Sequence, residues 1–368
     1  MFFYAHLPSH LISSPPYIPM EILPISASHL IKSQITPFTD KLREGHKFKT
    51  CLQQQITSLF RSSPPRIDAP PRRRNKVVFI LGSTGTGKSK LAIDLAIHFD
   101  GEVVNSDKMQ VYAGLDIITN KVTEEECAGV PHHLIGGVHP AADFTAFDFC
   151  GEANRAIESI IARGRLPIIA GGSNSYIERL VDDDKGKFRS KYECCFIWID
   201  VDLPVLHSFV SERVDKMVDM GLVEEARTMF DPNGDYSKGI RRSIGVSEMD
   251  RYFRAGRSVD GEAKGKILKE AINDIKENTM KLTYNQLRKI RRLSTLPGWE
   301  VRKVDATEAF RWRSDPQAER VWTIVARDPS IKIVRKFLDS KLDAVHFQDD
   351  RRIEANCCHH HDQCEERA

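Results

Sequence analysis

Short apolar runs alternate with longer stretches of helical periodicity once the chain has passed residue 75. An apolar, β-branched run bounded by glycine or polar residues predicts a buried parallel strand, whereas apolar residues three or four apart predict a helix with one buried face. Strands are predicted at residues 76–81, 101–107, 166–172 and 196–202, with a further extended segment at 132–138. Helices are predicted at residues 90–97 and 143–162. This alternation predicts an α/β fold in which helices flank a parallel, doubly wound sheet.

The pattern changes at Leu203, after which helical periodicity dominates. An apolar stripe ends before Gly221, which is a natural helix stop. Its members are Val210, Val214, Met217 and Val218. Residues 267–293 are predicted to form one long basic helix and residues 299–304 a final strand. We therefore expect a mainly helical C-terminal part.

These patterns divide the chain into four segments. We expect residues 76–202 to form the α/β core, residues 203–335 the helical part, and residues 336–368 a polar, disordered tail. Residues 1–75 are rich in serine and proline, poor in acidic residues and basic at their end. Such a leader is typical of an organelle transit peptide, and a disordered cytosolic extension is the alternative.

Composition narrows the classes of protein to consider. The chain has 368 residues, of which 41% are hydrophobic and 29% charged, as in globular proteins. Its net charge of +3 is too small to argue for nucleic-acid or membrane binding. No run reaches the roughly 18 apolar residues that a membrane span needs. Eight cysteines without the spacing of a disulfide scaffold indicate a reducing compartment.

The tail contains a group of potential zinc ligands, namely Cys357, Cys358, His359, His360, His361 and Cys364. Four such ligands suffice for zinc, but adjacent cysteines strain chelation and the spacing matches no usual structural site. A polar tail without metal is the preferred interpretation.

The strand at residues 76–81 leads into a glycine-rich loop, and a helix follows at once. The loop has the phosphate-loop pattern Gly-x-x-x-x-Gly-Lys-Ser. Its residues are Gly82, Ser83, Thr84, Gly85, Thr86, Gly87, Lys88 and Ser89. Glycines let backbone N–H groups converge on phosphate oxygens, and the helix N-terminus adds partial positive charge. Lys88 adds a full charge, and the Ser89 hydroxyl is a candidate Mg²⁺ ligand. The loop therefore predicts a di- or triphosphate site, and a glycine-rich turn without ligand is the alternative.

Acidic and basic residues are also placed to act near this loop. Asp107 ends the second strand, at the sheet edge where parallel folds bind ligands. Its carboxylate is a candidate Mg²⁺ ligand or general base, and a helix cap or strand-end ion pair is the alternative. Asp200 and Asp202 are weaker candidates for the metal role. Arg241 and Arg242 suit a clamp on a second phosphate, although paired surface arginines are often only solvated.

Six motifs, in order, resemble those of plant adenylate isopentenyltransferases, the cytokinin-synthesising enzymes. They are GSTGTGKS (82–89), NSDKMQVY (105–112), GLDIITNK (114–121), PHHL (131–134), GGSNSYI (171–177) and RRSIGV (241–246). The resemblance covers roughly residues 76–310. It is far more specific than the phosphate loop alone, which occurs in many unrelated folds. It implies a P-loop NTPase-like sheet and transfer of a dimethylallyl group from dimethylallyl diphosphate to the N6 amine of adenine in ATP, ADP or AMP, with a lean toward ATP and ADP.

The resemblance also implies roles for individual residues. The phosphate loop would hold the donor's diphosphate, and Lys88 and Mg²⁺ would stabilise charge on this leaving group. Asp107 would be the general base, and Arg242 or Arg241 would reach the diphosphate. Ser173 would provide the hydroxyl group that a threonine provides in the related transfer-RNA enzymes. Residues 203–335 would complete the substrate channel. Candidates for adenylate binding are Lys108, Thr119, Lys121 and Asn174.

Other functions remain as alternatives. Transfer-RNA dimethylallyltransferases share the motifs but carry a long helical insertion after the Gly-Gly strand, where this chain has some two dozen residues between Gly172 and Phe196. Residues 357–364 do not resemble the zinc finger of the eukaryotic transfer-RNA enzymes, so RNA is the weaker substrate. A P-loop small-molecule kinase and a nucleotide-binding module explain the loop but not the later motifs. We expect a monomer without membrane association in the plastid, with the cytoplasm or mitochondrion as alternative locations.

Overall fold

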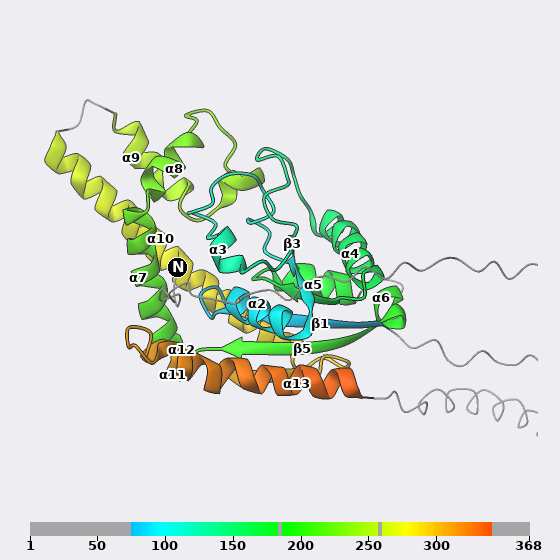
Figure 1. Cartoon of the computed structure of the whole chain (residues 1–368). Helices are drawn as coiled ribbons and strands as arrows, with labels where there is room; N and C mark the ends of the chain where they lie inside the picture. The colour runs from blue at the N-terminus through cyan, green and yellow to red at the C-terminus, as the bar shows by residue number, and fades with distance from the viewer. Residues whose placement is uncertain (1–74, 183–185, 257–259, 341–368) are drawn as a thin grey trace, which may run out of the picture. The chain divides into compact units, whose positions relative to one another are not determined.

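Six parallel strands form one sheet with the order β3-β2-β4-β1-β5-β6. Figure 1 labels β1, β3 and β5 of this sheet. The strands are β1 (Asn75–Leu81), β2 (Gly101–Asn105), β3 (His132–His133), β4 (Leu166–Ala170), β5 (Tyr192–Asp200) and β6 (Val301–Asp305). The computed structural model describes residues 75–182, 186–256 and 260–340. The predicted transit peptide and the Cys/His group of the tail lie outside the described residues.

Side chains of the central strand alternate between two apolar layers, as a sheet covered on both faces requires. Val77, Phe79 and Leu81 of β1 belong to one buried cluster, whereas Val78 and Ile80 belong to the other. The predicted parallel α/β fold with helices on both faces is therefore confirmed.

The first layer, which contains Phe79, is built by helices from the middle of the chain and by the long C-terminal helix. Its main helices are α4 (Ala146–Ala162), α5 (Asn174–Val181) and α10 (Gly261–Leu293), and it also contains Phe188 of the short α6 (Lys187–Lys191). α7 (Leu203–Asp219) contributes Val214 and Met217 to this layer and Val210 to the other. The shorter elements around this part are α3 (Glu124–Cys127), α8 (Leu222–Thr228), η1 (Gly239–Arg242), η2 (Ser247–Met249) and α9 (Asp250–Arg254).

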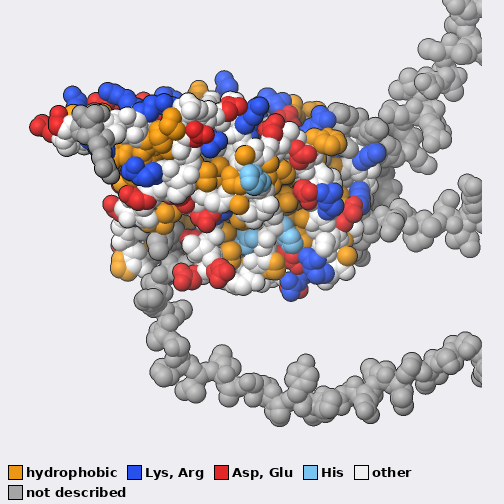
Figure 2. Space-filling view, turned by 90° about the horizontal axis from the view of Figure 1, so that it is seen from above, with side chains coloured by type: hydrophobic (Ala, Val, Ile, Leu, Met, Phe, Trp, Pro, Cys, Tyr) orange, Lys and Arg blue, Asp and Glu red, His pale blue; other side chains and the backbone are white. Residues whose placement is uncertain are grey.

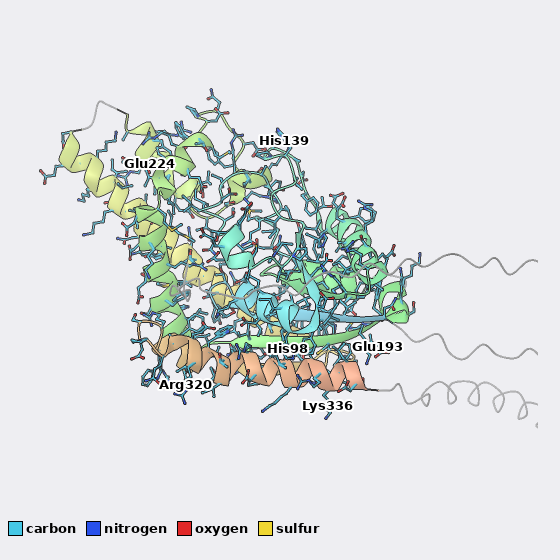
Figure 3. All side chains as sticks on the ribbon, in the orientation of Figure 1. His98, His139, Glu193, Glu224, Arg320 and Lys336 are labelled. Carbon is cyan, nitrogen blue, oxygen red and sulfur yellow. The ribbon has the colours of Figure 1, made fainter. Side chains whose placement is uncertain are left out.

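The second layer joins the helix after the phosphate loop to the end of the described chain. It consists of α2 (Lys88–Phe99), α11 (Thr307–Arg311), α12 (Ala318–Trp322), the π-helical turn η3 (Thr323–Arg327) and α13 (Asp328–Asp339). His98, at the end of α2, lies beside α13 and contacts Arg335 there at 2.8 Å (Figure 3). Because β6 also pairs with β5, the C-terminal part completes both the sheet and this layer.

Several element ends differ from the sequence-based expectation. The strand predicted at 132–138 is confined to His132–His133, because Leu134 and Gly136 have φ angles of 62° and 68° and interrupt the extended backbone. The polar tail predicted from residue 336 begins inside α13, which continues to Asp339. This helix extends because Phe337 and Leu338 pack on the second layer together with buried Val334.

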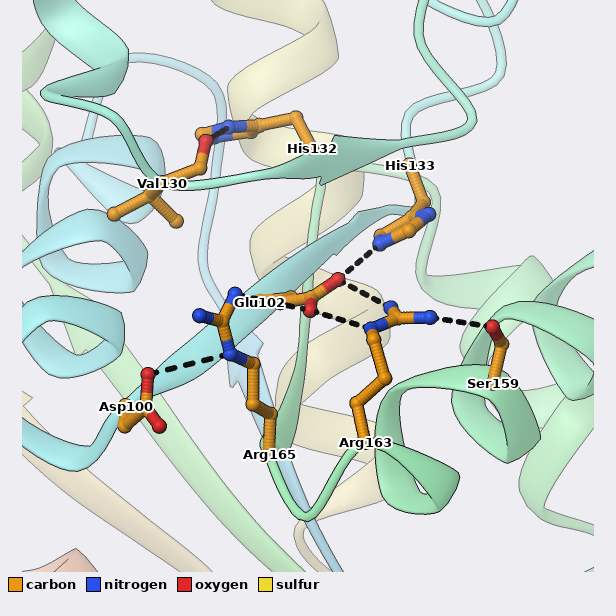
Figure 4. Close-up of polar contacts among 8 residues, drawn as sticks. All are labelled: Asp100, Glu102, Val130, His132, His133, Ser159, Arg163 and Arg165. Atoms are coloured by element: carbon orange, nitrogen blue, oxygen red, sulfur yellow. Dashed lines mark hydrogen bonds and ion pairs between the residues drawn. The ribbon is translucent and has the colours of Figure 1, made fainter. Parts of the chain in front are cut away.

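A buried carboxylate on β2 binds side chains from the edge strand β3 and from the segment before β4 (Figure 4). Glu102 of β2 is 2% exposed and binds His133 of β3, Arg163 and Arg165. The hydrogen bond from Arg163, with that from His133, holds the pKa of Glu102 at about 2. The cluster lies at the opposite end of β2 from Asp107, so we assign it a structural role.

The surface mixes both signs of charge. On the face shown in Figure 2, basic and acidic side chains are interspersed along the edge, and apolar side chains and histidines are visible nearer the middle. Among the described helices, none combines the length and the apolar character that a membrane crossing demands.

Candidate active site

The phosphate loop connects β1 to α2 at the carboxyl end of the sheet. Gly85 and Gly87 have φ angles of 84° and 87°, which glycine adopts without steric cost. A Cβ on Gly85 would lie 2.7 Å from Val210 of α7, and a Cβ on Gly87 would lie 2.6 Å from the ring of Trp322 in α12. The loop is therefore held between α7 and α12, and larger residues at these glycines would displace it.

Helix α10 holds the loop through two buried polar residues. Gln286 accepts a hydrogen bond from the Thr84 N–H (2.7 Å) and donates one to the Gly172 carbonyl (2.9 Å). The Ser83 hydroxyl donates to the Thr283 carbonyl (2.9 Å). Helix α10 thus ties the phosphate loop to the residues that follow β4. Within the loop, the Thr86 hydroxyl donates to the Ser83 carbonyl, also at 2.9 Å, and Gly82 packs against β5.

Two cations lie against the loop. Lys88 donates from Nζ to the Ser83 carbonyl (2.7 Å), and Arg213 of α7 donates from Nη2 to the Thr84 hydroxyl (3.1 Å). Burial lowers the pKa of Lys88 to about 8 and that of Arg213 to about 10, and the charge of Asp107 opposes both shifts. The loop therefore presents two partly desolvated positive groups to one small volume.

Asp107 lies directly after β2 at the same end of the sheet. Its N–H donates to the Asn105 side chain (3.0 Å), and its Oδ1 accepts from the Met109 N–H (2.9 Å). These bonds fix the carboxylate, whose charge acts on both Lys88 and Arg213. The structure thus brings Asp107, the predicted base, and the two cations that lie against the loop into one site.

The end of β4 forms another wall of the site. The Ser173 hydroxyl accepts from the Lys108 N–H (2.9 Å), and the Ser173 N–H donates to the Ser106 carbonyl (3.2 Å). Gly171 packs so closely on the neighbouring chain that a Cβ there would lie 2.4 Å from the Ser106 carbonyl carbon. Ser173 therefore fixes the backbone on both sides of Asp107.

Two of the adenylate-binding candidates flank this wall. Asn174 is buried at the start of α5, and within the described residues its Oδ1 has no hydrogen-bond partner. Lys108 carries an exposed side chain next to Asp107. Their roles toward the adenylate stay predictions.

The other two adenylate-binding candidates, Thr119 and Lys121, form contacts within the turn that contains them. The Thr119 hydroxyl donates to the Leu115 carbonyl (2.7 Å), and Lys121 forms an ion pair with Asp116 (2.8 Å) and a hydrogen bond to the Gly114 carbonyl. These contacts close the turn at residues 114–121 and do not join it to the phosphate loop.

Arg241 and Arg242 of η1 face different neighbours. Arg241 donates to the Met229 carbonyl (3.1 Å) and lies 3.9 Å from the Asp231 carboxylate. Arg242 lies 3.4 Å from the Tyr112 hydroxyl, and its charge also acts on Tyr176 of α5, the helix that Ser173 precedes. Arg242 is therefore the member of the pair that lies toward Tyr112 and Tyr176.

The two acids at the end of β5 pair with the C-terminal part. Asp200 lies 2.8 Å from Lys303 of β6, and Asp202 lies 3.5 Å from Arg311 of α11. These ion pairs account for both acids without a metal.

Arg213 and Gln286 touch the loop but were not among the predicted residues. A single arginine beside an apolar stripe carries no recognisable pattern. Gln286 left a usable signal, because Thr279, Thr283 and Gln286 recur at helical spacing on the face of α10 that is buried. Polar residues on a buried helix face need partners, and here those partners are the loop and the residues after β4.

The residues of the site fit a magnesium ion that arrives with a phosphate ligand. In the part of the chain that the structure describes, no group of three or more His, Cys, Asp or Glu side chains could hold a metal. Ser89 is exposed in the first turn of α2, and the Asp107 carboxylate lies at the same edge of the sheet. Mg²⁺ commonly takes one or two protein ligands and completes its shell with phosphate oxygens and water.

Known proteins are similar to this chain in sequence and in fold. The family model described as IPP transferase matches residues 110–187 and 182–293. Adenylate isopentenyltransferase 5, chloroplastic, of Arabidopsis thaliana is 57% identical over 286 residues, covering 77% of this chain and 84% of the relative. The chain belongs to the adenylate isopentenyltransferase family. Adenylate isopentenyltransferase 7, mitochondrial, of the same plant is 50% identical over 268 residues, 73% of this chain and 82% of the relative.

Solved structures show the same fold as this adenylate isopentenyltransferase family member. A transfer-RNA isopentenylpyrophosphate transferase of Bacillus halodurans is 26% identical with a TM-score of 0.56, and the match covers 72% of this chain and 99% of that one. A eukaryotic dimethylallyltransferase acting on tRNA has a TM-score of 0.58 at 24% identity, covering 72% and 79%. The second match shows the fold alone.

Proposed function

We propose that this adenylate isopentenyltransferase transfers the dimethylallyl group of dimethylallyl diphosphate to the N6 amine of adenine in ATP or ADP, and also in AMP, as a step of cytokinin biosynthesis. The observation that carries the proposal is the single site made by Lys88, Arg213 and Asp107. Lys88 and Arg213 donate hydrogen bonds to the phosphate loop, and the Asp107 carboxylate lies beside Gly172, which Gln286 connects to that loop. Cations suited to a diphosphate lie there beside a carboxylate suited to a proton. Family membership supplies the identity of the two substrates.

The phosphate loop acts on the donor. The bond between the prenyl carbon and the bridging oxygen breaks, and its electron pair leaves with the diphosphate. Loop N–H groups, the N-terminus of α2 and Lys88 meet this growing negative charge, so they bind the transition state more tightly than the substrate. Arg242 of η1, which contacts the Tyr112 hydroxyl, is the arginine that we assign to the same group.

Asp107 acts on the acceptor. The exocyclic amine of adenine is a weak nucleophile because its lone pair is delocalised into the ring. A carboxylate that accepts a hydrogen bond from N6–H orients the amine and takes its proton as the new N–C bond forms. The hydrogen bond that the Asp107 N–H donates to Asn105 and the one that its carboxylate accepts from Met109 hold Asp107 in place for this task.

Magnesium, when bound with the diphosphate, would neutralise part of the leaving group's charge, and Ser89 is the residue that would hold it.

The leader supports a plastid location. Its acid-poor, serine-rich composition is that of a transit peptide, and relatives are named both chloroplastic and mitochondrial. A fluorescent protein fused behind residues 1–75 should enter chloroplasts of plant cells. Entry into mitochondria, or retention in the cytosol, would refute the plastid assignment.

The function is tested by incubating the full chain with dimethylallyl diphosphate, Mg²⁺ and ATP, ADP or AMP in separate reactions. Mass spectrometry should detect the N6-prenylated nucleotide. Product with transfer RNA alone would instead establish the transfer-RNA enzyme, and phosphate transfer from ATP without prenyl donor would establish a kinase.

Asp107→Asn tests the assignment of the base. We expect turnover to fall by about 10²–10⁴-fold, the usual contribution of a general base, while diphosphate still binds. Asp219→Asn is the matched control, since Asp219 is exposed at the end of α7 and should leave turnover unchanged. Loss of diphosphate binding in Asp107→Asn would point to a metal-binding role instead.

A further inference from the structure

Helix α7 crosses directly over the tip of the phosphate loop. The side chains of Leu206, Phe209 and Val210 surround the position that a Cβ on Gly85 would occupy, at 3.4, 3.5 and 2.7 Å. Arg213 lies one turn further along this helix and reaches the neighbouring Thr84. The apolar contacts of α7 therefore set the place from which Arg213 approaches the loop.

The guanidinium of Arg213 is only partly satisfied. Nη2 donates to the Thr84 hydroxyl at 3.1 Å, whereas the Nε atom is buried and has no hydrogen-bond partner within the described residues. Nε and Nη2 form one edge of the planar group, and this edge is the one that commonly grips two oxygens of a carboxylate or phosphate. A buried N–H without an acceptor is rare and costs free energy, so we expect a bound ligand to supply the acceptor for Nε.

The charges around Arg213 favour an anion as that acceptor. Lys88 is a second cation close to it, and Asp107 is the carboxylate that acts on both. Across the part of the chain that the structure describes, neither cation forms an ion pair with a carboxylate within 4.0 Å, and each is held by a neutral oxygen of the loop. Two cations of this kind, together with the N-terminus of α2, give the loop more positive charge than the Asp107 carboxylate neutralises.

We propose that Arg213 is a further diphosphate-binding residue of this enzyme. Its Nε–Nη2 edge donates to an oxygen of the diphosphate in the phosphate loop, on the side opposite the loop's own backbone. When the prenyl–oxygen bond breaks, the electron pair stays on the diphosphate, and Arg213 stabilises the added charge. The identity of the diphosphate as that of the prenyl donor rests on the proposed function, whereas the binding of a diphosphate by Arg213 does not.

The test compares Arg213→Met, which removes the charge, with Arg213→Lys, which keeps the charge but loses the fork. Arg155→Met is the matched control, because Arg155 is 69% exposed on α4 and, among the described residues, forms an ion pair only with Glu152 of the same helix. Inorganic diphosphate with Mg²⁺ is titrated calorimetrically into each protein. We expect Arg213→Met to weaken this binding by about 10- to 100-fold, the range for a lost charge-assisted hydrogen bond, with Arg213→Lys intermediate and the control unchanged.

Two further readings separate an anion-binding role from a structural one. Without ligand, Arg213→Met should melt at the same or a higher temperature than the wild type, because a poorly satisfied cation has been removed. With diphosphate present, it should gain less stabilisation than the wild type. A lower melting temperature combined with unchanged diphosphate affinity would overturn the proposal and leave Arg213 as a structural contact.

Steady-state kinetics distinguishes the two possible sources of phosphate. We expect Arg213→Met to raise the KM for dimethylallyl diphosphate and to lower kcat, while the KM for ADP changes less than twofold. A change confined to the KM for ADP would show that Arg213 binds the adenylate phosphates, which contradicts the proposal. If the wild type showed no prenyl transfer, while Arg213→Met lost the diphosphate binding that the wild type has, the proposed function would fail and this inference would stand.

Discussion

Substitution of Gly171 by alanine tests how closely the site depends on the contact between β2 and β4. A Cβ there would lie 2.4 Å from the Ser106 carbonyl carbon and 2.5 Å from the Asp107 nitrogen. Carbon atoms normally approach no closer than about 3.5 Å, so the two chains must separate by roughly 1 Å. Both clashing atoms belong to the backbone, which cannot rotate out of the way as a side chain can.

The expected loss of stability has two parts. Overpacking of a tight interior typically costs about 1–3 kcal/mol. Separation also weakens the hydrogen bonds from Ser106 N–H to the Ala170 carbonyl (2.9 Å) and from Ser173 N–H to the Ser106 carbonyl (3.2 Å). At about 0.5–1.5 kcal/mol each, these bring the expected decrease in the free energy of unfolding to about 2–6 kcal/mol. Since Asp107 moves with the strand end, turnover should fall about 100-fold in molecules that remain folded.

Urea unfolding followed by circular dichroism measures the stability, and prenyl transfer to ADP measures the turnover. Gly151→Ala is the matched control, because Gly151 is exposed in α4 with nothing within 4 Å of a Cβ at that position. Alanine favours the helix, so the control should be more stable by up to about 1 kcal/mol and equally active. Wild-type stability and turnover in Gly171→Ala would refute the argument that this contact positions Asp107.

Three further changes have defined outcomes. Gln286→Leu leaves the Thr84 N–H and the Gly172 carbonyl without their partner, so the free energy of unfolding should fall by about 2–4 kcal/mol in urea titrations; a change below 1 kcal/mol would show that water replaces both bonds. Lys88, whose pKa is lowered to about 8, loses its charge as the pH rises through 8. Calorimetry should therefore show that the affinity for diphosphate decreases above pH 8 in the wild type and decreases less in Lys88→Arg. Identical pH profiles of the two proteins would exclude Lys88 as the titrating group. Glu102 has its pKa depressed to about 2, so its ion pairs stabilise the fold fully above the unfolded pKa of 4.5 and are lost as the pH falls toward 2; acid titration should show this loss in the wild type and a flatter curve in Glu102→Gln.

Much of the core was predictable because its determinants are local. Buried parallel strands need continuous apolar runs, and the phosphate loop needs glycines at fixed spacing, so both leave short patterns in the sequence. The position of Asp107 was predictable for the same reason, since it closely follows a strand of the sheet, and parallel sheets bind ligands at the carboxyl ends of their strands. These features depend on residues near one another in the chain.

The contacts that complete the site depend on residues far apart. Arg213 lies 129 positions from Thr84, and Gln286 lies 202 positions from it. The helical spacing of Gln286 with Thr279 and Thr283 marks it as a polar residue that needs a partner, but only the packing of α7 and α10 shows that both residues contact the phosphate loop. The end of α13 was misplaced for a related reason, because Phe337 and Leu338 become core residues only when the second layer lies beneath them.

The ring of Trp322 against Gly87 has a consequence for the order in which the enzyme matures. The tryptophan comes 235 residues after the glycine and is anchored by a hydrogen bond to Asp94 of α2 (2.7 Å). A nascent chain therefore carries the whole phosphate-loop motif long before the ribosome has made Trp322, whose ring packs against Gly87 of that loop. Closing so long a stretch of chain is entropically slow, so the substrate-binding conformation is expected to form only after synthesis of α12 and β6 is complete. During translation the growing chain would hold the binding motif without the means to act on its substrates.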